Sequence, residues 1–231
     1  MSAFQNATVV VVHGAWADGS SWEPVIRRLQ KEELDVVAAP IPLTSLSDDA
    51  AALQRTIART EGPVIVAGHA YAGTVVGTAH DERVKALVYI AALAPDEGET
   101  VAEVFYRDEP HPQAPKLVPD ADGFIWMPDE SFAEAFAQDA TPEQTALCRA
   151  VQRPISVRCI QEPVAAPAWK TKPVWYLLAE KDRMINPKTQ RFMAERMNAT
   201  IRSFAVDHTP LLTAPDRAAG IILEAAKATL A

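Results

Sequence analysis

The sequence has very little cysteine, and this scarcity excludes two kinds of protein. Cys148 and Cys159 are the only two cysteines in 231 residues, and neither belongs to a Cys-x-x-Cys pair or stands next to a histidine. A disulfide framework or a zinc site would need further thiols or histidines at regular spacing. We therefore expect two buried or half-buried thiols, and we expect neither a metal nor a cofactor.

Basic clusters and long apolar runs are missing as well. The 22 Lys and Arg residues are outnumbered by 30 Asp and Glu, the formal net charge is −8, and no stretch is rich in Lys and Arg. That balance argues against nucleic acid or an anionic membrane as a partner. No apolar run reaches the roughly 18 residues of a membrane span, and residues 1–8 lack the basic and apolar regions of a targeting signal. We expect a cytoplasmic protein that binds a small neutral molecule, and a homodimer stays open.

Short apolar runs alternate with helical patterns along most of the chain. The runs are rich in β-branched residues and suit buried strands, whereas the helical stretches carry apolar residues three or four positions apart. Because parallel strands need a connecting helix, this alternation predicts an α/β fold with a doubly wound, mainly parallel sheet of about six strands. Ser20 or Ser21 is the expected N-cap of the first helix. The expected strands cover residues 7–12, 35–39, 63–68, 84–92, 173–178 and 200–206, and the expected helices cover 20–33, 47–60, 74–80, 186–197 and 215–230.

The alternation stops after the fourth expected strand and returns before the fifth. The intervening residues are rich in proline and aromatic side chains, with one helical pattern over 129–138 and a second helix that starts at Thr141, just before Pro142. A stretch of this length is too long for a plain loop. We therefore predict a helical cap, residues 96–172, inserted into a single domain that covers 1–231. The alternative is that these helices complete an ordinary face of the domain.

Residues 63–73, Pro-Val-Ile-Val-Ala-Gly-His-Ala-Tyr-Ala-Gly, predict a strand, a sharp turn and a helix. In the nucleophile elbow Gly-x-Ser-x-Gly, such a turn presents a serine hydroxyl above the end of a parallel sheet, and small flanking residues let the strand and the helix approach closely. The apex here is Ala70. The position that would present a nucleophile therefore carries only a methyl group.

Three other loops follow expected strands, at the edge where parallel sheets bind ligands. Asp182 lies in the loop after the fifth strand and His208 in the loop after the sixth, so that elbow, acid and histidine have the chain order of an α/β-hydrolase triad. Glu180 is the nearest competitor for the acid, since Asp207 is adjacent to the histidine and badly placed to orient its ring. His13 and His69 are interpreted as residues that order or pack their loops. The backbone N–H groups of Ala15 and Tyr71 are the expected oxyanion donors.

The chain resembles the α/β-hydrolases over essentially its whole length. It is most similar to the branch that contains plant methylesterases, hydroxynitrile lyases and their bacterial esterase-like relatives. The resemblance implies Asp182 as the triad acid and His208 as the triad base. Two departures stand out, Ala72 at the last glycine of the elbow pattern and Ala70 at the serine. The motifs that carry the resemblance are Val-Val-His-Gly-Ala-Trp (11–16), Gly-His-Ala-Tyr-Ala-Gly (68–73), Val-Tyr-Ile-Ala-Ala (88–92), Asp-Arg-Met-Ile (182–185) and His-Thr-Pro (208–210).

Ala70 leaves three hypotheses for function. The first is a carboxylesterase-like enzyme for a small ester whose serine has been replaced, a nucleophile knock-out with very low or absent hydrolysis. The second is an enzyme of lyase, aldol or addition type that uses His208 as general acid and base together with the oxyanion hole. The third is a non-catalytic receptor for an ester-like or acid-like ligand.

Aromatic residues of the expected cap and the strand-end loops predict a mostly apolar pocket with few polar anchors. The ligand would be a small ester or carbonyl compound. The same side chains could instead form the cap's own small core. The candidates for the pocket wall are Trp16, Tyr71, Tyr106, Phe124 and Trp126.

Overall fold

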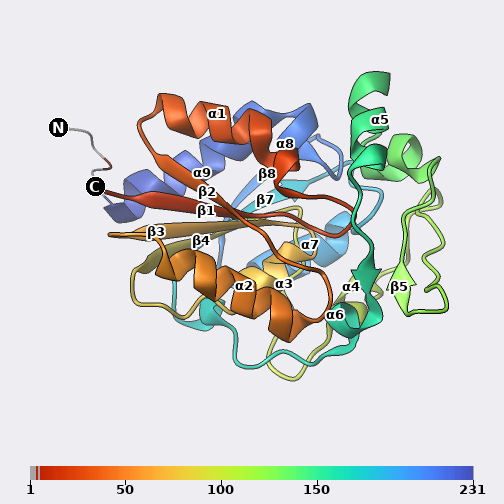
Figure 1. Ribbon diagram of the computed structural model, residues 1–231, viewed down its shortest axis with the longest axis horizontal. Helices are drawn as coiled ribbons and strands as arrows, with labels where there is room; N and C mark the ends of the chain where they lie inside the picture. Colours follow the sequence, from red (N-terminus) through yellow and green to blue (C-terminus); the bar gives the residue numbers. More distant parts are fainter. Residues whose placement is uncertain (1–3, 5, 231) are drawn as a thin grey trace.

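A six-stranded sheet forms the centre of the protein (Figure 1). The computed structural model describes residue 4 and residues 6–230, so part of the N-terminal stretch considered above lies outside the described residues. The strand order is β2-β1-β3-β4-β7-β8, and every neighbouring pair is parallel. The predicted α/β class, with a doubly wound parallel sheet of six strands, is confirmed. The strands are β1 (Thr8–Val12), β2 (Asp35–Ala39), β3 (Val64–His69), β4 (Val84–Ile90), β7 (Val174–Ala179) and β8 (Thr200–Phe204).

Helices cover both faces of the sheet, which explains why its central strands are apolar throughout. Consecutive side chains of a strand point to opposite faces. In β3, accordingly, Val64 and Val66 pack on the side of α2, while Ile65 and Ala67 pack on the side of α9. One face carries α1 (Glu23–Lys31) and α9 (Pro215–Leu230), and the other carries α2 (Leu46–Ala58), α3 (Ala72–Val76) and α7 (Pro187–Arg196).

The chain reverses direction across the sheet between β1 and β3. The connection from β1 leads through α1 to β2 at one edge, whereas β3 continues toward β4 on the other side. Loops that leave the carboxyl ends of two such strands diverge to opposite faces and leave a crevice between them. The loops after β1 and β3 are those that carry Ala15 and Ala70.

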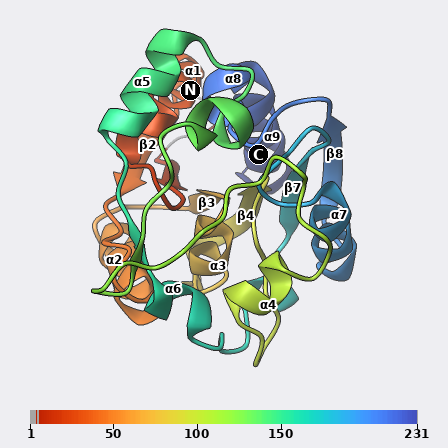
Figure 2. The ribbon, with the colours of Figure 1, turned by 90° about the vertical axis from the view of Figure 1, so that its right-hand side faces the viewer.

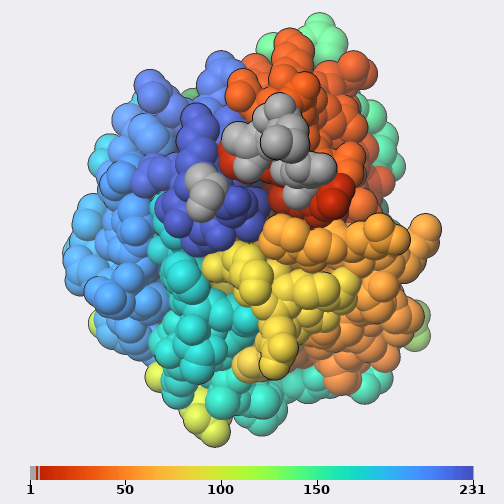
Figure 3. Space-filling view, turned by 90° about the vertical axis from the view of Figure 1, so that its left-hand side faces the viewer, coloured from red at the N-terminus to blue at the C-terminus, as the bar shows by residue number. Residues whose placement is uncertain are grey.

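Most of the 96–172 segment lies beyond the carboxyl ends of the strands, as Figure 2 shows, and its last residues run back to the amino end of β4, where Lys172 Nζ donates to the Val84 carbonyl. Figure 3 shows the opposite end of the molecule, where α9 and residues near 80 and 170 lie around the amino ends of the strands. Buried apolar residues of the segment join the same core cluster as α2 and α3. Its elements are α4 (Val101–Phe105), β5 (Phe124–Ile125), the π-helix η2 (Phe132–Phe136), α5 (Pro142–Ala150), β6 (Ile155–Ser156), α6 (Val157–Gln161) and the 3-10 helix η3 (Ala168–Lys170), with β5 and β6 antiparallel.

Local hydrogen bonds move several helix boundaries from their predicted positions. The prediction of Ser20 or Ser21 as N-cap is wrong, because the Asp18 carboxylate accepts the N–H of Ser20 at 2.8 Å and starts a 3-10 turn, η1 (Gly19–Trp22), ahead of α1. The helix predicted over 74–80 begins earlier, at Ala72, since the carbonyls of Ala70 and Tyr71 already accept the first helical N–H groups. Within the pattern over 129–138, only Phe132–Phe136 form a helix, and it is a π-helix.

The predicted start at Thr141 is confirmed by a capping box, in which the Thr141 hydroxyl and the Gln144 side chain each accept the other residue's backbone N–H. This pair satisfies N–H groups that a helix start otherwise leaves free. The two α5 residues Leu147 and Cys148 remain exposed and half-buried respectively, while Cys159 is buried. Within the described part of the chain, none of the helices combines the length and apolar character needed to cross a membrane.

Candidate active site

The turn after β3 places Ala70 in a backbone conformation that L-residues seldom adopt. Its φ is +52°, in the left-handed region, where a non-glycine residue is destabilised unless its surroundings hold it there. Three backbone hydrogen bonds do so: Ala70 donates to the Ile90 carbonyl, and its own carbonyl accepts the N–H groups of Gly73 and Leu93. This is the sharp strand-to-helix turn that a nucleophile elbow requires.

Gly68 lets α3 pack directly against the end of β3. A Cβ at Gly68 would lie 2.6 Å from Cγ2 of Val76 and 2.8 Å from the Ala72 carbonyl oxygen.

We expect Gly68→Ala to lower the free energy of unfolding by about 1–3 kcal/mol through overpacking. The matched control is Gly220→Ala within α9, where a Cβ would meet nothing within 4 Å. It should be neutral or stabilise by up to about 1 kcal/mol. Urea denaturation would measure both, and equal shifts in the two variants would contradict this account of the elbow.

The structure brings Asp182 and His208 into hydrogen-bond contact, although 26 positions separate them. The His208 Nδ1 lies 2.8 Å from the Asp182 Oδ2, and both side chains are buried. The other Asp182 oxygen accepts the backbone N–H groups of Met184 and Ile185 at 2.7 and 2.9 Å. A carboxylate held in this way selects the imidazole tautomer with its proton on Nδ1, which leaves Nε2 as a proton acceptor.

Gln190 is a further support of the acid that the sequence analysis did not identify. Its Nε2 donates to Asp182 Oδ2 at 2.7 Å and to the Ile185 carbonyl at 3.0 Å, and its Oε1 accepts the Ala179 N–H. The residue is fully buried on α7. The available signal was a polar residue on the helix face that also carries Met193 and Ala194, since buried polar groups are almost always hydrogen-bonded.

His69 lies beside His208 and hydrogen-bonds to its backbone. Its Nε2 donates to the backbone carbonyl of His208 at 2.7 Å, and the two rings lie 4.9 Å apart. Because a carbonyl can only accept, Nε2 carries the proton. Burial lowers the pKa of His69 to about 3, and the neighbouring His208 adds to the effect. His69 is therefore a neutral hydrogen-bond donor that fixes the backbone of His208, a more specific role than the packing that the sequence suggested.

Acidification is expected to destabilise the fold through His69. The unfolded chain takes up a proton near pH 6.5, whereas the folded protein does so only near pH 3. The contribution of the neutral His69 ring to the free energy of unfolding is thus fully present above pH 6.5 and is lost as the pH falls toward 3. The loss amounts to several kcal/mol, since one pKa unit corresponds to about 1.4 kcal/mol. Urea titrations at pH 7, 5 and 4 would show that the free energy of unfolding depends less steeply on pH in His69→Gln than in the parent. The control, His111→Gln at an exposed histidine, should show the same pH dependence as the parent.

Asp49 has the opposite effect within the same pH range, so only the difference between variants is diagnostic. Burial raises its pKa to about 6, and the folded state therefore gains stability from this group at low pH and loses it as the pH rises from about 4 to 6. Parallel curves for the parent and His69→Gln would refute the assignment of His69 as a buried neutral ring.

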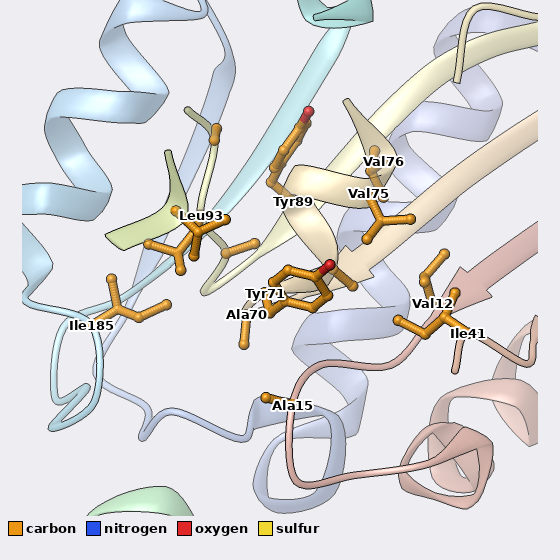
Figure 4. Packing of buried hydrophobic residues seen from close by; sticks show 14 of the residues in the cluster. Val12, Ala15, Ile41, Ala70, Tyr71, Val75, Val76, Tyr89, Leu93 and Ile185 are labelled. Atoms are coloured by element: carbon orange, nitrogen blue, oxygen red, sulfur yellow. The ribbon is translucent and has the colours of Figure 1, made fainter. Parts of the chain in front are cut away.

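Two backbone N–H groups lie beside the apex. Among the described residues, neither Ala15 N–H nor Tyr71 N–H donates a hydrogen bond, whereas Trp16 N–H donates to the Arg153 carbonyl. The loop after β1 lies against the apex, because a Cβ on Gly14 would come within 3.1 Å of the Ala70 Cβ. Figure 4 shows Ala15, Ala70 and Tyr71 near one another. Free N–H groups in this position can bind a carbonyl oxygen that develops negative charge.

Tyr71 is fixed by a buried network that the sequence did not indicate. Its hydroxyl donates to the Asp49 Oδ2 at 2.7 Å, Cys159 Sγ lies 3.6 Å from the same oxygen, and the Leu43 N–H donates to the other oxygen at 2.7 Å. Burial raises the pKa of the Cys159 thiol to about 12, so it is a protonated donor. The network connects α2, the elbow and α6, three elements whose proximity depends on the tertiary fold.

A cavity of about 60 Å³ opens beside Ala70 and His208. Of the expected wall residues, Trp16, Tyr71 and Tyr106 line it, whereas Phe124 and Trp126 do not. The alternation of side chains along a strand explains this correction, since Ile125 faces the cavity and its two neighbours turn away. The described residues that line the cavity include no Asp, Glu, Lys or Arg: Ala15, Trp16, Ala70, Tyr71, Leu93, Val101, Ala102, Phe105, Tyr106, Leu117, Ile125, Ile155, Ile160, Met184, Ile185 and His208.

Trp16 lies in the buried wall of the cavity, whereas Trp126 lies on the surface. The Trp16 indole N–H donates to the Ile125 carbonyl at 2.9 Å, and its side chain is buried. The Trp126 indole lies 3.3 Å from an Asp120 carboxylate oxygen on the surface and is 51% exposed. Trp16 therefore joins the β1 loop to β5, while Trp126 belongs to the outer side of the 96–172 segment.

Comparison with protein families agrees with this arrangement. A sequence model of the alpha/beta hydrolase family matches residues 9–221. The chain belongs to the alpha/beta hydrolase family.

Several relatives share the fold over nearly their whole length. The alpha/beta hydrolase nvfD of Aspergillus novofumigatus (strain IBT 16806) is 23% identical over 242 residues, which are 94% of this chain and 96% of that protein. A pyrethroid hydrolase from Sphingobium faniae JZ-2 has a TM-score of 0.84 at 22% identity and covers 96% of this chain and 98% of its own. Polyneuridine aldehyde esterase has a TM-score of 0.83 at 17% identity, with 95% and 99% covered.

Proposed function

We propose that this chain has the site of a carboxylesterase for a small, mostly apolar ester, in which Ala70 occupies the place of the serine nucleophile. The observation that carries the proposal is that one cavity is lined by the left-handed apex at Ala70 and by His208, which is hydrogen-bonded to Asp182. Ester hydrolysis by this route needs a hydroxyl, a base oriented by an acid, and oxyanion donors. Only the hydroxyl oxygen is missing, so His208 has no nucleophile to deprotonate and hydrolysis should be very low.

The bound ester would be oriented by backbone rather than by charged side chains. Its carbonyl oxygen would accept the N–H groups of Ala15 and Tyr71, and its apolar groups would pack against Trp16 and the side chains of the 96–172 segment. We propose that this segment acts as a cap that shields the reacting carbonyl from water. A charged ligand would lose its hydration without gaining a counter-charge, and this favours neutral esters and carbonyl compounds.

The experiment that tests the proposal restores the missing oxygen. An Ala70→Ser variant should hydrolyse an activated ester such as p-nitrophenyl acetate, whereas the parent should not. If the folded variant gains no activity, the knock-out proposal fails. A protein that then still binds neutral esters without turnover would be a receptor.

A second function is favoured by one observation, the completeness of the acid and base pair without any nucleophile. A His208 imidazole held by Asp182 at the edge of an apolar cavity can transfer protons without a covalent intermediate. The oxyanion donors would then stabilise an enolate or alkoxide, as in lyase, aldol or addition reactions. This candidate requires turnover by the parent protein that His208→Ala abolishes, and an unaffected rate would eliminate it.

A further inference from the structure

The eight residues 132–139, which comprise η2 and the three residues after it, touch both loops that carry the acid and the base. We call them the π-helix segment. Arg183 Nη1 donates to the Glu134 carbonyl at 2.6 Å, and Gln138 Nε2 donates to the Lys181 carbonyl at 2.8 Å. Lys181 and Arg183 immediately flank Asp182. The π-helix segment therefore hydrogen-bonds to the acid loop on both sides of Asp182.

The π-helix segment also hydrogen-bonds to the loop that carries His208. The Thr209 hydroxyl donates to the Phe136 carbonyl, and the Asp139 N–H donates to the Asp207 Oδ2 at 3.1 Å. Asp207 and Thr209 immediately flank His208. All four neighbours of the acid and the base in the sequence thus hydrogen-bond to one short segment of the chain.

The geometry of a π-helix explains why this segment can serve both loops. Its own i→i+5 bond runs from the Ala137 N–H to the Phe132 carbonyl at 2.8 Å. The last carbonyls of a short helix have no partner within the helix, and here those of Glu134 and Phe136 accept the Arg183 and Thr209 side chains. Single π turns inside proteins are frequent at functional sites.

The Phe136 side chain also packs on the catalytic ring itself. Its ring meets the His208 imidazole edge to face, with 5.5 Å between the centroids, and it lies 6.4 Å from Trp16 on another side. Phe136 is buried, yet it is absent from the wall of the cavity beside Ala70. It can therefore influence the site only through His208 and the residues around it.

We propose that the π-helix segment fixes the position of the Asp182 loop relative to the His208 loop and that Phe136 is the positioning residue for the His208 imidazole. Phe136 fills the space behind the ring, so the imidazole keeps its Nδ1 toward Asp182 and its Nε2 free. The proposal rests on the proposed role of His208 as the base. It assigns to the 96–172 segment a task beyond covering the ligand, namely to complete the acid and base pair.

The test compares two phenylalanines of the same π-helix. Phe136→Ala removes the contact with His208, and Phe132→Ala removes an equally large buried side chain that packs on Phe136 and not on His208. The readout is the downfield proton NMR signal of the Nδ1–H of His208, identified by its loss in His208→Ala. In the Ala70 protein, we expect Phe136→Ala to broaden or remove this signal, and Phe132→Ala to retain it. Thr209→Val, which replaces the hydroxyl with a methyl group and so removes its hydrogen bond to the Phe136 carbonyl, should accelerate the exchange of the His208 Nδ1 proton with water.

Kinetics in the Ala70→Ser background give the second readout. Phe136→Ala should lower kcat by about 10²-fold, the effect of a misplaced catalytic group, with a smaller change in KM, and Phe136→Leu should recover part of the loss. Equal NMR signals and equal rates in Phe136→Ala and Phe132→Ala would overturn the proposal, as would an unchanged exchange rate in Thr209→Val. Because the NMR test needs no turnover, an inactive Ala70→Ser protein with the expected signals would reject the esterase function and leave the positioning role standing.

Discussion

Replacing Ala70 with serine is expected to raise the hydrolysis of p-nitrophenyl acetate by on the order of 10³- to 10⁶-fold. The upper value is the loss that removal of a serine nucleophile produces in an intact triad. The backbone at residue 70 already has the left-handed conformation that the elbow demands, and the residue lines the cavity, so the new hydroxyl needs no rearrangement of the turn. Stopped assays of ester hydrolysis with the parent as reference would measure the gain.

The matched control for this prediction is the double variant Ala70→Ser, His208→Ala. It keeps the hydroxyl and removes the base, so the gained activity should disappear. A gain that survives the loss of His208 would mean that the serine reacts without the proposed base.

Changing Asp182 to asparagine in the Ala70→Ser background is expected to lower kcat by about 10⁴-fold, the loss that the same change causes in serine proteases. Asparagine keeps the size of the side chain, but its amide can donate toward Nδ1 and stabilise the wrong imidazole tautomer. The residue is buried and accepts hydrogen bonds from His208, Gln190 and two backbone N–H groups. The measurement is kcat from full saturation curves, with folding checked by circular dichroism.

Glu180 provides the control for the acid. It is two residues away and exposed, and it was the competing candidate on sequence grounds. Glu180→Gln should leave kcat at the level of the Ala70→Ser protein. If Glu180→Gln abolishes activity and Asp182→Asn does not, the assignment of the acid must be reversed.

Much of the fold was predictable because its signals are local. The apolar run before His13 and the run before His69 are buried on both faces, so they contain no alternation that could be confused with an edge strand. The closing helix, Pro215–Leu230, has the predicted limits. The π-helix was not predictable, since one extra residue in a turn leaves almost no trace in the pattern of apolar positions. Helix starts shifted by one or two residues where a carboxylate or a turn carbonyl competed for the first N–H groups.

The candidate site was only partly predictable. Loops that follow parallel strands must meet at one edge of the sheet, and this reasoning led to residues 15, 70, 182 and 208. It did not reveal Gln190, Asp49 or the role of His69, because each acts through a partner from a different element. Phe124 and Trp126 were misplaced for a related reason. Aromatic composition suggests a pocket, but the side of a short strand on which a residue lies depends on its pairing.

The sequence by itself determined the parallel α/β architecture and the residue types at the strand ends, including the methyl group at the apex. These features depend on short-range periodicity and on the rule that parallel strands end together. The tertiary structure alone decided that His69 donates to the His208 carbonyl 139 positions away. It also decided that residues 132–139 hydrogen-bond to the residues that flank Asp182 and His208. Such contacts join elements separated by several crossovers, and their partners are selected by packing in three dimensions, which no local pattern of residues encodes.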